Sequence, residues 1–294
     1  MKQQNPGEWI KSTICAFSGS QENNLGDGTG ERAWGTPIVG FARGSDPIFH
    51  DYKRYVGDRH WTPAEAFNQQ FNGKTEGVDL TVISYILPQT ESTKRDNGGM
   101  STYPAERWAR SRVFGERFND ALRKHLAEEL TGAGFPAVAP FLIGAFSTYA
   151  SDRYQIASTW SERHMAYACG LGTFGICDGL ITEVGKAVRF GSVVAKISVE
   201  PTLRTYDNHR AYCLHEAEGN CGKCIDRCPA GAISFNGHDK SKCSNYLAKV
   251  TRPHVTNTYG FKGYGCGLCQ TDVPCESGVP ATSNSNEKSA PARD

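Results

Sequence analysis

Eight of the eleven cysteines lie in one stretch, between residues 213 and 275. The densest part reads Cys221-Gly-Lys-Cys224-Ile-Asp-Arg-Cys228-Pro229. It matches the last three cysteines and the proline of the Cys-x2-Cys-x2-Cys-x3-Cys-Pro run with which bacterial ferredoxins bind iron–sulfur clusters. The first position of that run falls on Glu218, and Cys213, five residues earlier, is the natural substitute if the loop bulges. This spacing predicts an iron–sulfur site.

A second run contains Cys266-Gly-Leu-Cys269, followed after five residues by Cys275, and Cys243 lies between the two runs. An iron–sulfur cube needs one thiolate on each of four irons, and the last cysteine of a ferredoxin run binds the other cluster. We therefore predict two [4Fe–4S] clusters with crossed ligands. The first would be held by Cys213, Cys221, Cys224 and Cys275, and the second by Cys228, Cys243, Cys266 and Cys269.

The alternative is structural zinc, because two Cys-x2-Cys pairs can form a four-thiolate zinc site. That arrangement leaves four of the eight cysteines without a role and gives no reason for the Cys228-Pro229 step. The three cysteines outside the run, Cys15, Cys169 and Cys177, are expected to be small buried hydrophobic residues or spectators.

The composition is that of an ordinary globular protein, with 38% hydrophobic and 21% charged residues. The 32 Lys and Arg residues balance 31 Asp and Glu residues, which gives no general attraction for nucleic acid or an anionic membrane. No apolar run reaches the length of a membrane span, and the N-terminal residues do not resemble a secretory signal. We expect a cytoplasmic protein, and thiols in that compartment serve metal or redox chemistry more often than disulfides.

The distribution of cysteines predicts an α/β domain over residues 1–205, a small ferredoxin-like domain with two [4Fe–4S] clusters over 206–276, and a disordered tail over 277–294. Within the first domain, β-branched residues 78–87 and 191–199 predict strands. Residues 104–130 predict a long helix, with apolar residues at a spacing of four. Residues 160–169 predict a shorter helix, and the polar, glycine-rich residues 20–35 predict a loop.

The order of these cysteines resembles the iron–sulfur domain of epoxyqueuosine reductases and reductive dehalogenases. The resemblance continues upstream through Glu162–Gly175 (ERHMAYACGLGTFG), Leu180-Ile-Thr and Val188-Arg-Phe-Gly, and more faintly at Phe41-Ala-Arg-Gly and Tyr52-Lys. It implies a nitroreductase-like α/β core, a cobalamin-dependent reductase, and a low-potential electron donor such as ferredoxin or flavodoxin.

Three features depart from the epoxyqueuosine reductase pattern. Ile156 stands where those enzymes have a general-acid aspartate, no C-terminal helical repeats are expected after Cys275, and the second run is Cys-x2-Cys-x5-Cys. We therefore expect a small-molecule substrate, with no nucleic acid and no membrane as partner.

The resemblance places residues 160–175 beside the corrinoid. It predicts His164, Gly170, Gly172, Thr173, Phe174 and Gly175 as cofactor-binding residues. Glu162, with Arg153 and Tyr154, is the candidate for the catalytic residues, because reduction by cobalamin needs protons as well as electrons. The alternatives are an exposed charged patch around Glu162 and a glycine turn that only lets another part of the backbone come close.

Three hypotheses for function remain. The first is a reductase that passes electrons through two clusters to a corrinoid and then to a small substrate. The second is an electron-transfer protein or reductive activator for a partner enzyme, without its own corrinoid. The third is a zinc-stabilised binding module.

Overall fold

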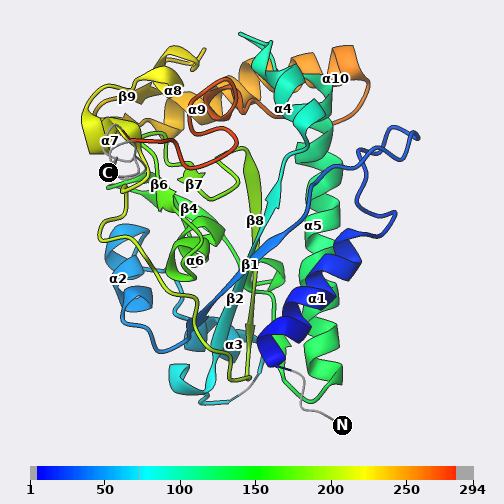
Figure 1. Cartoon of the computed structure of the whole chain (residues 1–294), viewed down its shortest axis with the longest axis vertical. Coiled ribbons are helices and arrows are strands. Elements are labelled where there is room, and N and C mark those ends of the chain that lie inside the picture. The colour runs from blue at the N-terminus through cyan, green and yellow to red at the C-terminus, as the bar shows by residue number, and fades with distance from the viewer. Residues whose placement is uncertain (1–4, 72, 283–294) are drawn as a thin grey trace, which may run out of the picture.

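The structure is a computed structural model and describes residues 5–71 and 73–282. Its centre is a four-stranded sheet in the order β1-β2-β8-β3, and every neighbouring pair of strands is antiparallel. The strands are β1 (Ile38–Arg43), β2 (Thr81–Pro88), β3 (Ala137–Val138) and β8 (Val188–Ala195). Figure 1 shows this sheet between helices, with the cysteine-rich part of the chain across one end.

Helices cover both faces of the sheet. Alternate residues of β2 enter two separate hydrophobic cores, as the two-residue repeat of a strand requires. Ile83, Tyr85 and Leu87 pack in the core that contains α1 and α5, whereas Val82 and Ile86 pack in the core that contains α2, α3 and α6. The helices of this part are α1 (Pro6–Ser18), α2 (Ile48–Tyr55), α3 (Pro63–Gln70), η1 (Gly77–Asp79), α4 (Glu91–Gly98), α5 (Glu106–Gly132), η2 (Pro140–Leu142) and α6 (Glu162–Ala168).

The longest helix, α5, follows from its sequence pattern. Phe118, Leu122, Leu126 and Leu130 recur every four residues, so they lie on one face, and all four are buried. The helix ends at Gly132, and Gly134 takes a positive φ of 91°. The predicted helix over 104–130 is therefore confirmed, with bounds two residues later at each end.

The other predicted elements are also present. The strand expected over 78–87 is β2, preceded by the short η1 turn, and the strand expected over 191–199 is β8, which starts and ends earlier. The helix expected over 160–169 is α6, and residues 20–35 contain turns and bends with no helix. Most of the predicted tail, residues 283–294, lies outside the described residues.

The cysteine-rich part consists of short elements joined by tight turns. It contains α7 (Leu214–Glu218), α8 (Lys223–Asp226), β9 (Ile233–Ser234), β10 (Gly237–His238), α9 (Lys240–Tyr246), the π-helical turn η3 (Leu247–Thr251), α10 (Arg252–Tyr259) and η4 (Leu268–Gln270). Two small hairpins, β4 (Thr148–Ser151) with β5 (Gln155–Ser158) and β6 (Thr173–Phe174) with β7 (Leu180–Ile181), lie between the sheet and this part.

A third hydrophobic core joins the two parts of the chain. Ile176 and Ile181, around the second hairpin, pack with Cys213, Cys224 and Val273 of the cysteine-rich part. The predicted boundary near residue 205 therefore separates two regions that share a core. None of the helices within the described residues has both the length and the apolar character that a membrane crossing requires.

A buried ion network fixes α5 against β8 and α6. Arg123 is 1% exposed, and its guanidinium contacts Glu116 (3.1 Å), Asp120 (2.6 Å) and Glu162 (3.2 Å). It also donates to the carbonyl oxygen of Phe190 on β8 (2.8 Å). Glu116 accepts a further hydrogen bond from Nε of Arg189 (2.8 Å). The network thus fixes where the side chains of Arg189 and Glu162 lie.

Replacing Glu116 with Gln should destabilise the protein by about 3–5 kcal/mol, because it removes the largely buried carboxylate that Arg112, Arg123 and Arg189 share. Burial raises the pKa of Glu116, but Arg189, Arg123 and Arg112 outweigh it and lower the pKa from 4.5 to about 2. The carboxylate therefore contributes stability above pH 4.5, and this contribution is lost as the pH falls towards 2. Urea unfolding at pH 7 and at pH 3 measures both effects.

The matched control is Glu128→Gln on the same helix, where the side chain is 65% exposed. We expect a change of about 0.5 kcal/mol or less for this variant. Equal destabilisation by the two variants would contradict the role given to the network.

Candidate functional site

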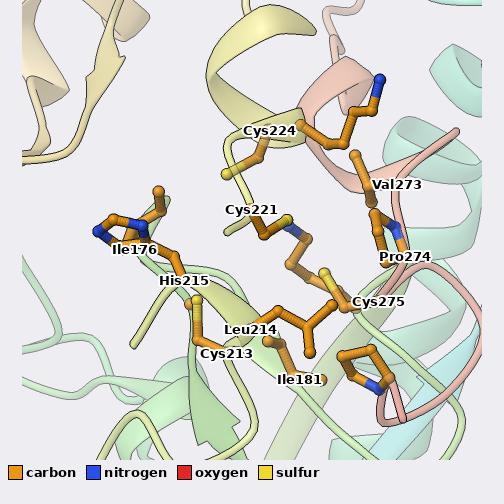
Figure 2. Close-up of a pocket in the computed structure, with 14 residues that line it drawn as sticks. Ile176, Ile181, Cys213, Leu214, His215, Cys221, Cys224, Val273, Pro274 and Cys275 are labelled. Carbon is orange, nitrogen blue, oxygen red and sulfur yellow. The ribbon is translucent and has the colours of Figure 1, made fainter. Parts of the chain in front are cut away.

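Four cysteines line a small cavity at the junction of the two parts. Cys213 precedes α7, Cys221 and Cys224 lie at the start of α8, and Cys275 lies in the loop after η4. Figure 2 shows their sulfur atoms turned towards the same space, with Ile176, Ile181 and Val273 around them. The cavity has a volume of about 20 Å³. We call it the first cavity.

The other four predicted ligands line a second cavity. Cys228 follows α8, Cys243 lies on α9, and Cys266 and Cys269 flank the start of η4. The backbone N–H of Ala232 donates to Sγ of Cys228 (3.3 Å), as hydrogen bonds to a cluster ligand would. This second cavity has a volume of about 210 Å³, about ten times that of the first.

The fold thus sorts the eight cysteines into the same two sets of four that the crossed spacing predicts. Lining a cavity is not ligation, so the ligand assignment stays a prediction. Within residues 5–71 and 73–282, no three His, Cys, Asp or Glu side chains are grouped as a single metal ion requires. The cysteine sulfurs around a four-iron cube lie farther apart than those around one tetrahedral zinc ion. The absence of a single-ion site among the described residues therefore does not test whether a cube can bind.

Cys177 lies between the two sets. Its side chain packs in one core with Cys224 of the first set and Cys269 of the second. Nζ of Lys186 is 3.3 Å from its sulfur. Burial lowers the pKa of Lys186, but the negative charge on the Cys177 sulfur beside it outweighs burial and raises the pKa above its ordinary value. Cys177, expected to be a small buried hydrophobic residue or a spectator, is buried and lies next to both predicted ligand sets.

The wall of the second cavity is rich in arginine. Arg112, Arg163 and Arg189 line it, and no Asp or Glu is among the described residues of this wall. The Arg112 guanidinium donates to the hydroxyl of Tyr264 (2.7 Å), and Arg189 is held by Glu116. The wall therefore favours an anionic ligand. These side chains come from α5, α6 and β8, so no local sequence pattern marks them as one site.

A histidine lies beside Cys243 in the second cavity. Nδ1 of His238 is 3.4 Å from Oδ2 of Asp178. Burial lowers the pKa of His238, but its bonds to Asp178 and to the Cys243 thiol outweigh burial and raise the pKa to about 9. His238 thus pairs with the Asp178 carboxylate beside this wall.

The three predicted catalytic residues are in two different places. Glu162 lies in the ion network, where Ser192 Oγ donates to it (2.6 Å), and burial raises its pKa to about 7 in spite of Arg123. Arg153 and Tyr154 lie in the turn between β4 and β5, where the guanidinium stacks on the ring at 5.1 Å. None of the three lines either cavity. Their catalytic role stays a prediction.

The predicted cofactor-binding segment packs mainly against its own chain. A Cβ atom at Gly172 would lie 2.2 Å from the carbonyl oxygen of Ile181, and one at Gly170 would lie 3.0 Å from that of Leu203. Glycine is therefore needed here for backbone packing. Thr173 Oγ1 accepts a hydrogen bond from the backbone N–H of Tyr212 (2.9 Å).

The rest of that segment is divided between packing and the first cavity. His164 is bonded through Nδ1 to Ser161 Oγ (2.8 Å) and packs on Tyr52 and Phe174. Gly175 lines the first cavity. The neighbouring residue Arg163, which was not among the predicted cofactor ligands, is the one on α6 that reaches the second cavity.

Comparison with known proteins gives a partial sequence match and a fold match. No protein-family model matches the chain. The epoxyqueuosine reductase of Bacillus anthracis is 32% identical over 125 residues, which are 40% of this chain and 30% of that protein. The match thus spans less than a third of the length of that relative.

Two solved structures illustrate the fold match. An epoxyqueuosine reductase with an epoxyqueuosine-modified tRNA-Tyr stem loop has a TM-score of 0.50 and 16% identity, over 94% of this chain and 67% of that chain. A catabolic reductive dehalogenase in complex with 3-bromo-4-hydroxybenzoic acid has a TM-score of 0.48 and 15% identity, over 93% and 37%. The chain is therefore related in sequence to epoxyqueuosine reductases over part of its length and has a similar mixed α/β fold.

Proposed function

We propose that this protein is an iron–sulfur oxidoreductase that binds two [4Fe–4S] clusters and passes electrons to a small anionic acceptor in the second cavity. The observation that carries the proposal is the sorting of eight cysteines into two groups of four at neighbouring cavities. The similarity to named reductases supports a reductase role. Bound at these thiolates, the clusters would supply one-electron transfer.

The residues of the chain fit two clusters. Each cavity holds one predicted set of four cysteines, which is the complete ligand count of a cube, and Cys177 also lines the second cavity. Lys186 beside the first set and the arginines beside the second supply positive charge that offsets the negative charge of thiolate-bound iron. Apolar Ile176, Ile181 and Val273 keep water from the first set, and exclusion of solvent is one determinant of cluster potential.

The acceptor is proposed to bind in the second cavity because of its surplus volume. The same cube would occupy both sites, yet the second cavity is about ten times larger. Besides the cysteines, Trp108 and Tyr264 line the second cavity and offer flat apolar surfaces. Arg163 also lines this cavity. Arg163 donates to the backbone carbonyl oxygen of Asp178 but forms no ion pair with a carboxylate among the described residues, so its guanidinium can still bind an anion.

A corrinoid acceptor, which the family resemblance implies, is the alternative to the small anion. We derive no step through cobalt. A small molecule is likewise proposed in place of tRNA, because position 156 carries an exposed isoleucine and no acid.

Anaerobic purification tests the proposal directly. We expect about eight irons per chain, a broad absorbance near about 400 nm, and loss of that absorbance on reduction. Zinc in place of iron would refute the proposal. Corrinoid that co-purifies at one molecule per chain would show that the acceptor is the corrinoid and not the small anion. A protein that contains all eight irons but transfers electrons only to a partner enzyme would support the electron-carrier hypothesis.

Cysteine variants test the crossed ligand sets. Cys275→Ser and Cys221→Ser should each remove about half of the iron, and the double variant should remove no more, because both serve one cluster. Cys275→Ser combined with Cys266→Ser should remove nearly all of it. The exposed Cys15→Ser is the control and should remove none. If the double variant of Cys275 and Cys221 lost more iron than either single variant, the crossed ligand assignment would be wrong.

Arg163→Gln tests the anionic acceptor. Dithionite-reduced protein is mixed with 4-nitrobenzoate or with the neutral 4-nitrobenzyl alcohol, and reoxidation of the clusters is followed by absorbance. The rate ratio of the anion to the alcohol should fall at least about fivefold, because one charge at ~4 Å is worth ~1 kcal/mol even in bulk water. Arg117→Gln removes an exposed arginine of α5 and should leave the ratio unchanged. An unchanged ratio in both variants would refute the site.

A further inference from the structure

The contact between the two cysteine sets is made by a residue pair that belongs to neither. Cys177 is 5% exposed and lines the second cavity, and its side chain packs with Cys224 of the first set and Cys269 of the second. Lys186 is 3% exposed and lines the first cavity. Its Nζ is 3.3 Å from Sγ of Cys177.

The charge of Lys186 is balanced by sulfur. The ammonium group donates to Sγ of Cys177, and no Asp or Glu forms an ion pair with it among the described residues. A buried ammonium is costly unless anions compensate it. Negatively charged sulfur close to the Lys186 ammonium would therefore offset the cost of burying its charge.

The backbone holds the lysine at this point. The N–H of Lys186 donates to the carbonyl oxygen of Cys275 (2.8 Å), so the lysine is fixed to the loop that carries a predicted ligand. A Cβ at Gly179 would lie 2.8 Å from Cδ of Lys186, so the absence of a side chain there leaves room for the lysine stem. Lys186 lies two residues before β8, one of the two inner strands of the sheet, which limits its movement.

We propose that Lys186 sets the reduction potentials of both clusters, with Cys177 as the packed contact across which an electron passes from one ligand set to the other. The inference rests on the proposed two-cluster function. Reduction adds one electron to a cluster and removes one from a low-potential one-electron donor, and no bond or proton changes hands. A fixed positive charge in a site with little water stabilises the reduced form more than the oxidised form, because the reduced form carries one more negative charge.

Lys186→Met tests the proposal because methionine keeps much of the stem and removes the charge. Redox titration of the anaerobic protein, followed by electron paramagnetic resonance, gives the midpoint potential of each cluster. We expect both potentials to become more negative, with the equilibrium between reduced and oxidised cluster shifted at least about tenfold, which is 59 mV for one electron. Lys186→Arg keeps the charge, so its cluster potentials should stay close to those of the unmodified protein.

The matched control is Lys223→Met. Lys223 also lines the first cavity but is exposed, so water and salt screen its charge and a much smaller shift is expected. Shifts of equal size in the two methionine variants, or no shift in either cluster, would overturn the proposal. If Lys186→Met binds no iron, Lys186→Gln, which retains a hydrogen-bond donor, takes its place. Absence of iron from the unmodified protein would instead refute the two-cluster function.

Discussion

A buried positive charge needs anions beside it, and in this protein one such charge joins the two parts of the molecule. Lys186 precedes the central strand β8, yet its side chain contacts sulfur atoms and its backbone bonds the loop after η4. The neighbouring Gly185 allows that loop to come close, since a Cβ there would lie 2.0 Å from the carbonyl oxygen of Glu276. The sheet and the cysteine-rich part therefore cannot shift independently without separating this ammonium from the sulfurs.

A second buried charge plays the same role on the other side of β8. Arg123 connects α5 to Phe190 of β8 and to Glu162 of α6, and Glu116 extends the network to Arg189 at the second cavity. Charges that are desolvated in this way need close partners, so the network resists rearrangement. The rigid frame behind the cavity is built from ion pairs, while the cavity wall itself holds arginines whose charge faces the space beside the second cysteine set.

The similarity to epoxyqueuosine reductases concerns the fold, the order of the cysteines and the glycine turn over 170–175. The sheet, its helices and the cysteine order agree with the resemblance, and the fold comparison covers most of the chain. The glycine turn over 170–175 is also present, but its close approaches are mainly to backbone atoms of residues 181 and 203. A segment that resembles a cofactor-side motif can thus keep its shape for packing alone, which is why similarity of the motif does not by itself assign a ligand.

The sequence by itself determined the elements with strong periodicity and the cysteine groups. The spacing of four in α5, the buried run of β2 and the Cys-x2-Cys turns are local patterns, because each depends on residues a few positions apart. The tertiary structure alone decided which distant residues share a space. Arg112, Arg163 and Arg189 meet at one cavity because α5, α6 and β8 pack together, and Cys177 lies between the ligand sets because the β6–β7 hairpin packs against α8. Such contacts depend on long-range packing, and no spacing along the chain encodes them.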